Sequence, residues 1–351
     1  MWPSRPSPLE QLYRCGDVER HPGPRPKGAR VPRVLDLMSV ELVREDTAAA
    51  GRGARARFLV WLAEQGVPLH IRALALAPAV LASLLRAYAL VLWRTGASLS
   101  ELRNLITYLQ RDYKDLKANL AEVWDIVTRW ERVFPTRHRV PLPFTLYQAM
   151  VAISLLWGWP RFGATLSLAF QGIARIGEVL RASRSLLVLP SDNLSRKAVA
   201  YLMVEDPKTA RRGGGLVQHI RVKDEQVVAH LELVFGPLSP GEPLYPGSAP
   251  NFRKCWDRIL SELGVPPTSG LTPGSVRGGG AVAAYDDDIP ISDIMWRMRV
   301  AQLSTLQHYL QEVAALNALG DVSPAYRTAI SRAAECLPLL RLRPTGSAKE
   351  V

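Results

Sequence analysis

The segment RMRVAQLSTLQHYLQ, residues 297–311, is the part of this chain from which the fold is best predicted. Leu303, Leu306 and Leu310 recur at spacings of three and four, which predicts an amphipathic helix over about 302–317. Tyr309 lies beside that apolar stripe, either as a half-buried packing residue or as a nucleophile. Because a free phenol titrates near pH 10, a nucleophilic tyrosine needs cations and a proton acceptor around it. The rest of the chain must supply those groups.

The composition is that of a basic protein large enough for two domains. The chain has 351 residues, of which 48% are apolar, and domains usually take roughly 100–200 residues each. Its formal net charge is +12 and its pI is about 9.9. Such a protein usually binds polyanions, and we expect nucleic acid before an anionic membrane surface.

Cysteine spacing and hydropathy argue against a metal-binding protein, a membrane protein and a secreted protein. Cys15, Cys255 and Cys336 lie far apart and form no metal-ligand spacing, so we expect a reduced compartment and no metal or other cofactor. No apolar run reaches the ~18 residues of a membrane helix, and no secretory signal opens the chain. We therefore expect no membrane partner.

Residues 1–35 are predicted to be a disordered basic tail. They hold seven prolines, with seven Lys or Arg against three Asp or Glu (7 − 3 = +4), and few large apolar residues. Within them GDVERHPGP (16–24) resembles the ribosome-skipping peptide of picornaviruses and many retroelements, Asp-(Val/Ile)-Glu-x-Asn-Pro-Gly-Pro. Seven of the eight motif positions agree, and His21 replaces the asparagine. The alternative is a Pro/Gly-rich linker that matches by chance.

Residues 36–135 are predicted to form a helical domain. Helices are expected around Phe58, over 76–96 and after Ser98, which with Glu101 forms a capping-box pattern. A further apolar stripe runs from Leu120 to Trp130. Its basic residues would face phosphates or form an ordinary solvated surface: Arg52, Arg55, Arg57, Arg94, Arg103, Arg111, Lys114 and Lys117.

A linker at 136–143 is predicted to lead into a mixed domain at 144–345, followed by a tail at 346–351. Runs at 198–204 and 216–222 flank the basic turn EDPKTARRGGG and predict a β-hairpin. The fold class is thus mainly α with a small β-sheet. Helices are expected at about 144–157, 160–172, 224–235, 250–263, from Thr272-Pro273 onward, 291–299, 302–317 and 323–338.

Four candidate site residues follow one another along the chain in an order that indicates a function. Arg175 lies in ARIGEVL, Lys208 in the hairpin tip, Arg277 in TPGSVRGGGA and Tyr309 in STLQHYL. In this order and spacing they resemble the tyrosine recombinases, the phage-integrase-type enzymes that break and rejoin DNA. The resemblance covers roughly residues 54–320. It implies that the helical domain is a core-binding domain and the mixed domain the catalytic domain.

The resemblance also implies roles for these residues. Arg175 and Arg277 would stabilise charge on the non-bridging phosphate oxygens, and Tyr309 would attack to give a 3′-phosphotyrosine. Lys208 would protonate the leaving 5′ oxygen, with Arg211 or Arg212 as alternates. The reaction needs neither ATP nor a metal. Arg211, Arg212 and Arg299 are candidate DNA contacts, and Glu178 is expected to orient Arg175 or cap a helix.

The sequence departs from the family pattern at two positions. Gly274 stands where the family has histidine in His-x-x-Arg, and Val300 stands where it has His or Trp nine residues before the tyrosine. Neither carries a hydrogen-bonding side chain, and a missing acid–base group typically costs ~10²–10⁴ in rate. His308 is expected to be a surface or packing residue, although it is the one histidine near Tyr309 in sequence.

Two further motifs carry expectations. The glycines 278–280 cost ~1 kcal/mol each in a helix, which predicts a close approach by the hairpin or by a phosphate. The aspartates in AYDDDIP (284–290) would repel DNA and are expected in an exposed loop. The helix beyond Ser323 is expected to dock either on a neighbouring protomer or within its own chain.

Three hypotheses remain open at this point. The first is a nuclear, homo-oligomeric recombinase or integrase that acts on double-stranded DNA and comes from a eukaryotic mobile element. The second is a decayed relative that binds DNA without cutting it, favoured by Gly274 and Val300. The third, a helical protein-interaction module, is disfavoured by the basic pI.

Overall fold

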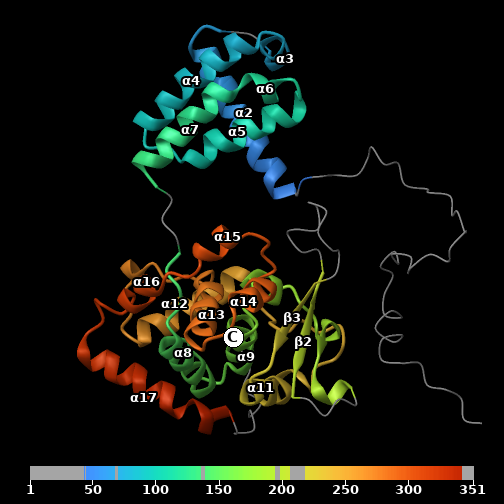
Figure 1. Cartoon of the computed structure of the whole chain (residues 1–351), viewed down its shortest axis with the longest axis vertical. Coiled ribbons are helices and arrows are strands. Elements are labelled where there is room, and N and C mark those ends of the chain that lie inside the picture. Colours follow the sequence, from blue (N-terminus) through green and yellow to red (C-terminus); the bar gives the residue numbers. More distant parts are fainter. Residues whose placement is uncertain are drawn as a thin grey trace, which may run out of the picture. The chain divides into compact units, whose positions relative to one another are not determined.

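The computed structural model describes residues 43, 45–67, 70–135, 139–193, 198–205 and 218–341, which divide into two compact units (Figure 1). The described residues up to Pro135 form the helical unit, and those from Arg139 onward form the second unit. The tail at 1–35 with its skipping-like peptide, the hairpin tip with Lys208, Arg211 and Arg212, and the tail at 346–351 lie outside the described residues.

The helical unit buries one apolar side of each longer helix. Its helices are α2 (Glu45–Glu64), α3 (Ile71–Ala75), α4 (Pro78–Arg94), α5 (Leu99–Asp112), α6 (Leu116–Asn119) and α7 (Ala121–Val133). The α5 stripe packs against α2, and Leu102, Leu105, Ile106 and Leu109 are fully buried. Gly96, with φ of +71°, ends α4 in the left-handed region that favours glycine.

The predicted capping box at the start of α5 is wrong in its second half. Ser98 accepts a hydrogen bond from the Ser100 amide at 3.2 Å, so it caps the helix as expected. Glu101, however, accepts hydrogen bonds from Arg57 Nε at 2.6 Å and from the Tyr88 hydroxyl at 3.1 Å. A guanidinium on α2 is a stronger donor for this carboxylate than the backbone amide of its own helix.

The second unit is built around two strongly buried helices. These are α8 (Phe144–Leu156) and α9 (Pro160–Gln171), and Pro160 occupies the first turn of α9 as predicted. The other helices are α10 (Ile176–Val179), α11 (Glu225–Phe235), α12 (Ala249–Glu262), α13 (Ser275–Asp286), α14 (Ile291–Met298), α15 (Leu303–Gln307), α16 (Glu312–Asn317) and α17 (Pro324–Arg341), with short 3₁₀ turns at Arg184–Leu186, Pro190–Asp192 and Pro267–Ser269.

A three-stranded antiparallel sheet lies beside these helices. Its order is β1 (Leu187–Val188), β2 (Ala200–Val204) and β3 (Gln218–Val222), so the predicted hairpin is confirmed and β1 is an addition. Leu202 pairs with Ile220, and both are buried. The opposite face carries Tyr201, Met203, His219 and Arg221. The whole chain is mainly α with this small sheet, as the sequence predicts.

The start of α13 differs from the prediction by two residues. Gly274, not Thr272, occupies the N-cap, and the helix begins at Ser275. The Ser275 and Val276 amides donate to the carbonyls three residues earlier, at Thr272 and Pro273, so a single turn precedes the helix. The Ser275 hydroxyl accepts from the Thr272 amide at 3.1 Å, so a side chain also closes this turn.

The three glycines of α13 allow a close approach, but not by the predicted partners. A Cβ on Gly279 would lie 2.2 Å from the Leu142 carbonyl oxygen, and one on Gly280 would lie 2.1 Å from that of Phe170. Backbone at the start of α8 and the end of α9 therefore fills this space, rather than the hairpin or a phosphate. Gly278 is different, because its nearest neighbour would be Pro141 at 3.5 Å, an ordinary contact.

The C-terminal helix docks within its own chain. α17 lies along α8 (Figure 1), with Ile330 and Leu337 buried and the Arg341 guanidinium donating to the Tyr147 hydroxyl at 3.2 Å. Tyr326 is 45% exposed, and its ring lies over Gly264. Of the two arrangements expected for this segment, the one within the chain is observed.

Candidate active site

The site begins where the chain turns sharply after α9. Ile173 is buried with φ of +49°, an unusual conformation for a β-branched residue, and Arg175 follows at the N-cap of α10. Strained backbone of this kind gathers at functional sites. The turn brings Arg175 and Glu178, three residues apart, onto the same side of the short helix α10.

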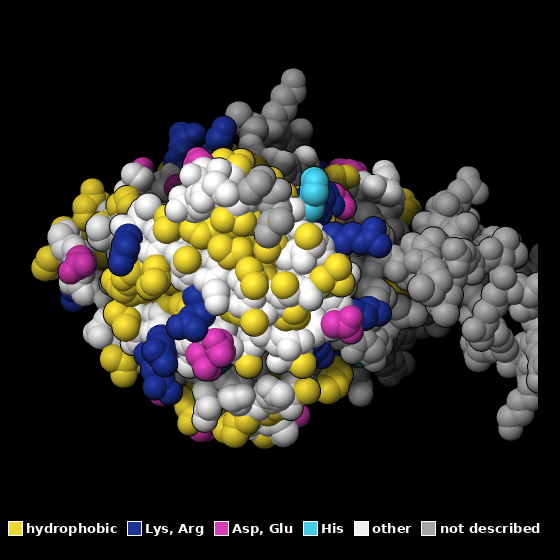
Figure 2. All heavy atoms as spheres, turned by 90° about the horizontal axis from the view of Figure 1, so that it is seen from above, with side chains coloured by type: hydrophobic (Ala, Val, Ile, Leu, Met, Phe, Trp, Pro, Cys, Tyr) yellow, Lys and Arg dark blue, Asp and Glu magenta, His cyan; other side chains and the backbone are white. Residues whose placement is uncertain are grey.

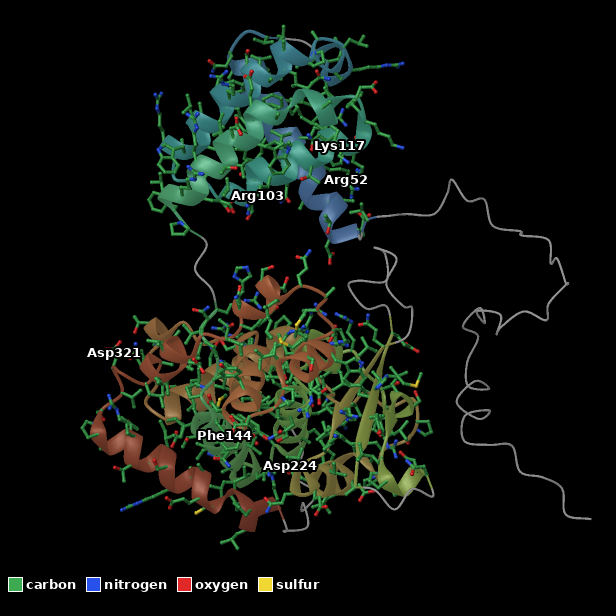
Figure 3. All side chains as sticks on the ribbon, in the orientation of Figure 1. Arg52, Arg103, Lys117, Phe144, Asp224 and Asp321 are labelled. Atoms are coloured by element: carbon green, nitrogen blue, oxygen red, sulfur yellow. The ribbon has the colours of Figure 1, made fainter. Side chains whose placement is uncertain are left out.

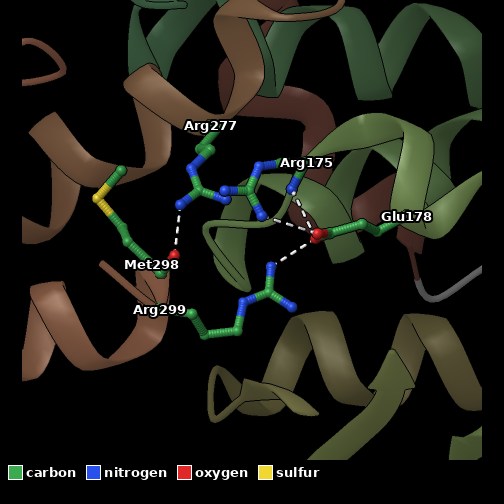
Figure 4. Close-up of polar contacts among 5 residues, drawn as sticks. All are labelled: Arg175, Glu178, Arg277, Met298 and Arg299. Atoms are coloured by element: carbon green, nitrogen blue, oxygen red, sulfur yellow. Dashed lines mark hydrogen bonds and ion pairs between the residues drawn. The ribbon is translucent and has the colours of Figure 1, made fainter. Parts of the chain in front are cut away.

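Glu178 is the acceptor at the centre of the cluster (Figure 4). Its side chain is 4% exposed and accepts from Arg175 Nη1 at 2.9 Å, the Arg175 amide at 3.3 Å and Arg299 Nη2 at 2.5 Å. Burial alone would raise the pKa of Glu178, but Arg299 and Arg175 outweigh it and hold that pKa below its ordinary value. The predicted role of Glu178 in orienting Arg175 agrees with these contacts. Its pairing with Arg299 was not predicted.

Arg277 brings a second guanidinium to the same place (Figure 4). It lies in the first turn of α13, is 3% exposed, and donates through Nη2 to the Met298 carbonyl. Burial lowers the pKa of Arg277, and the positive charges of Arg175 and Arg299 lower it further. Its Nε and Nη1 atoms have no hydrogen-bond partner among the described residues.

The cluster therefore holds more cations than anions. Three guanidiniums surround one carboxylate, which leaves a local charge of 3 − 1 = +2. Arg299, whose side chain is 8% exposed, also has Nε and Nη1 atoms without a partner in the described chain. Buried donors without acceptors are costly, so this arrangement is suited to an anionic ligand with several oxygens.

Tyr309 lies beside Arg277, and the predicted helix over 302–317 is wrong at this residue. α15 ends at Gln307 and α16 begins at Glu312, with Tyr309 in the turn between them. The Tyr309 amide donates to Leu306 at 2.8 Å, and its carbonyl accepts from Gln311 at 2.9 Å. The Arg277 Cζ atom lies 5.4 Å from the centre of the Tyr309 ring.

The structure shows Tyr309 as a packing residue beside a cation, and its role as a nucleophile stays a prediction. Tyr309 is half-buried and packs against a small apolar cluster with Leu306, Met298 and Ile173, and it also contacts a buried cation. The break in the helix follows from this packing. Leu306 is fully buried whereas Leu303 is 50% exposed, so the predicted stripe does not act as one continuous face.

The two positions that depart from the pattern are both occupied, one by its own side chain and the other by a neighbour. Val300 is half-buried and packs in the same apolar cluster as Tyr309. At Gly274, an added Cβ would lie 2.1 Å from Arg139 Nη1 and 2.8 Å from its Cζ atom. The Arg139 guanidinium therefore occupies the space of the absent side chain. Sequence analysis missed Arg139, because nothing in its own segment indicates a partner 135 residues further on.

Of the remaining predicted residues, Arg299 belongs to this cluster, and the others lie apart from it or outside the described residues. Lys208, Arg211 and Arg212 fall in the undescribed hairpin tip. Arg299, predicted as a DNA contact, is buried and paired with Glu178. His308 is exposed at the end of α15, and the aspartates at 286–288 are exposed, as expected.

Four of the eight basic candidates in the helical unit contact carboxylates. Arg52 pairs with Glu45, Arg57 with Glu101, Arg103 with Glu131 and Arg111 with Asp112. Arg52, Arg103 and Lys117 lie on three different helices of this unit (Figure 3). Figure 2 shows a face on which basic side chains are scattered between apolar ones.

The described residues contain neither a candidate membrane span nor a candidate metal-binding cluster. No helix there has the length and apolar character needed to cross a bilayer. Nor does that part of the chain hold a group of three or more His, Cys, Asp or Glu side chains arranged to bind a metal ion.

Comparisons with known proteins give only distant structural likenesses. No family model and no curated protein matches the sequence. The solved structures that resemble the chain include the Tn1549 transposon integrase in complex with transposon right-end DNA, with 15% identity, a TM-score of 0.49 and coverage of 82% of this chain and 93% of that one. The same integrase with circular-intermediate DNA gives 13% identity, a TM-score of 0.46 and coverage of 65% and 80%. The XerA recombinase has 14% identity and a TM-score of 0.39, and the match covers 80% of this chain and 94% of that one.

Proposed function

We propose that this chain is a site-specific DNA recombinase or integrase that cuts and rejoins double-stranded DNA through a 3′-phosphotyrosyl intermediate. The observation that carries the proposal is the position of Tyr309 beside Arg277, a buried guanidinium with two unpaired donor atoms. Arg175 is close enough to Arg277 to lower its pKa, so two cations accompany the tyrosine.

The ligand in this proposal is a phosphodiester. Its two non-bridging oxygens can accept hydrogen bonds from Arg277 and Arg175, which would satisfy donors that are otherwise costly to bury. As a nucleophile adds to phosphorus, negative charge grows on those oxygens, and fixed guanidiniums stabilise it. Glu178 acts as a positioning residue, because it holds Arg175 and Arg299 without using the donors of Arg277.

The proposed step exchanges one ester for another. The Tyr309 oxygen bonds to phosphorus, and the bond from phosphorus to the 5′ oxygen breaks. The phenol loses its proton to solvent and the 5′ oxygen gains one, which yields a phosphotyrosyl ester and a free 5′ hydroxyl. We assign the donation of that second proton to Lys208. The ester bond is retained throughout, so a hydroxyl can reverse the step.

A second candidate function is DNA binding without cleavage. It is favoured by Gly274 and Val300, neither of which has a side-chain donor or acceptor at the positions where the resembling family has one. The Arg139 guanidinium over Gly274 argues in the other direction, since it brings a donor into that space. We further propose, from the sequence alone, a nuclear location, homo-oligomerisation on DNA and an origin in a eukaryotic mobile element.

The test is capture of a covalent adduct. The full chain is incubated with nicked double-stranded DNA, from which the cleaved fragment diffuses away so that religation is blocked. We expect a protein–DNA band that survives denaturation with the native chain and disappears with Tyr309→Phe. Tyr326→Phe, at an exposed tyrosine on α17, serves as the matched control and should retain the adduct. Absence of an adduct from the native chain on a random-sequence duplex library, with DNA binding intact, would favour the second candidate.

A further inference from the structure

A second group of basic and aromatic side chains lies on the outer face of the sheet. It consists of Tyr201 from β2, His219 and Arg221 from β3, and Trp296 and Arg297 from α14, and we call it the outer-sheet cluster. In Figure 1, α14 lies next to β3. The cluster is separate from the site at Tyr309, because none of its residues contacts Glu178 or Arg277 in the described chain.

Trp296 is the organising residue of this cluster. Its ring is 50% exposed, and Arg221 Cζ lies 5.1 Å from the ring centre. His219 meets the same ring nearly edge-on, with centroids 5.3 Å apart at 70°, and Tyr201 meets His219 at 5.9 Å. These contacts fix the position of the Arg221 guanidinium without using its hydrogen-bond donors.

Arg297 places a second positive charge next to the first. Burial lowers the pKa of Arg297, the nearby Arg221 lowers it further, and Asp293 acts weakly in the opposite direction. The described residues provide neither arginine with a hydrogen bond or an ion pair, and the Nε atoms of both are buried without a partner. Two adjacent guanidiniums in this state repel each other.

Other arginines of the same unit show that the arrangement is unusual. Arg161 donates to Glu242 and to two backbone carbonyls, and Arg253 pairs with Asp257 at 2.7 Å. Arg175 and Arg299 share Glu178. The repulsion between Arg221 and Arg297 has no such acceptor, so an anion from outside the chain is the group that would relieve it.

We infer that the outer-sheet cluster is a second phosphate-binding site, which grips a DNA backbone phosphate other than the one that reacts at Tyr309. α14 links the two sites, because Trp296 and Arg297 belong to the cluster while the next two residues, Met298 and Arg299, contact Arg277 and Glu178. A single duplex can therefore contact both sites, which meet at the C-terminal end of this short helix. The inference rests on the proposed function for the identity of the nucleic acid.

A protein partner is the competing occupant of an exposed tryptophan. The charge of the cluster disfavours it, because an interface core is depleted in charged residues and burying two unpaired guanidiniums against protein is expensive. A phosphate between the two guanidiniums accepts hydrogen bonds from both, and Trp296 keeps one of them in place.

The test measures DNA affinity as a function of salt. Fluorescence anisotropy with a labelled duplex of mixed sequence compares the native chain with Arg221→Gln/Arg297→Gln. We expect weaker binding, and a slope of log affinity against log salt that is shallower by about one for each phosphate that the variant no longer neutralises. Arg258→Gln is the matched control, since Arg258 also stacks on tryptophans (Trp157 and Trp159, at 5.2 and 5.4 Å) but on α12, and it should leave the slope unchanged.

The outcomes separate this inference from the proposed function. If the double variant keeps the native slope, the inference is wrong, whether or not the native chain forms an adduct. If the slope becomes shallower while no adduct forms at saturating protein, the second site stands and the proposed cleavage fails. A changed sedimentation coefficient with unchanged DNA affinity would assign the cluster to a protein interface instead. Should the double variant fold poorly by circular dichroism, Arg297→Lys with Arg221→Lys, which keeps both charges, should restore the native slope.

Discussion

Two arginines of the helical unit and two of the second unit differ in their burial and in how many of their donor atoms find a partner. In the helical unit, Arg52 and Arg103 pair with carboxylates at the surface, with side chains 53% and 39% exposed. In the second unit, Arg277 and Arg299 are buried and keep donor atoms without partners. Exposed pairs contribute little to stability, whereas buried unpaired cations reduce it. The comparison teaches that the net charge of +12 says less about function than the few charges that the fold leaves unsatisfied.

The largest expected effect is on Arg277. Arg277→Gln removes one fixed donor from the proposed reaction, so adduct formation on the nicked duplex should slow by about 10²–10³-fold. Thermal stability should stay the same or rise, because the variant no longer buries a guanidinium with unpaired donors. A large fall in melting temperature would mean that Arg277 stabilises the fold. The proposed difference between the arginines of the two units would then not hold.

The second effect concerns the one carboxylate of the cluster. Glu178→Gln leaves Arg175 and Arg299 without their anion, and we expect a loss of about 3 kcal/mol in the free energy of unfolding, measured in urea. Glu131→Gln, which removes the exposed partner of Arg103, should cost less than about 1 kcal/mol. Equal losses in the two variants would contradict the comparison.

The same carboxylate predicts a dependence on pH. Since the pKa of Glu178 is lowered by folding, its contribution to stability is full above the ordinary glutamate pKa of 4.5 and is lost as the pH falls through its folded value. Urea unfolding at a series of pH values below 4.5 should therefore show a steeper loss of stability for the native chain than for Glu178→Gln. Parallel curves would show that Glu178 does not titrate as inferred.

A smaller effect is expected at the glycines of α13. Gly280→Ala sets a methyl group 2.1 Å from a backbone carbonyl that cannot move away, and should cost about 1–3 kcal/mol. Gly278→Ala has room for its methyl group and should instead stabilise the helix by up to about 1 kcal/mol. Both values follow from urea unfolding. Stability changes of the same sign in both variants would show that helix propensity, and not the close approach, determines the effect at these positions.

The regular elements and the order of the candidate residues could be predicted from the sequence. The apolar stripe of α5, the hairpin and the start of α17 at Pro324 follow from local spacing and capping, which a single sequence displays. The structure also brings Tyr309, Arg277 and Arg175 together, as the resemblance implies. The tasks assigned to these residues, and to Lys208, remain predictions.

The misses share a physical cause, which is that distant partners override local preference. Glu101 accepts a hydrogen bond from Arg57 on another helix and does not cap its own. Glu178 pairs with Arg299, 121 residues away. The leucine stripe predicts one helix, yet Tyr309 packs in the same apolar cluster as Leu306 from a turn that divides the segment into α15 and α16. Arg139 reaches the empty space at Gly274 from a segment predicted only as a linker.

The contact of Gly280 with the carbonyl of Phe170 has a consequence for how this site can change over generations. Phe170 lies near the end of α9, five residues before Arg175, and Gly280 lies three residues after Arg277. The gap between the two arginines is therefore set by one backbone lying directly on another. Apolar side chains elsewhere in the unit can be exchanged without altering that gap, so the rest of the sequence is free to change while these two cations keep their spacing.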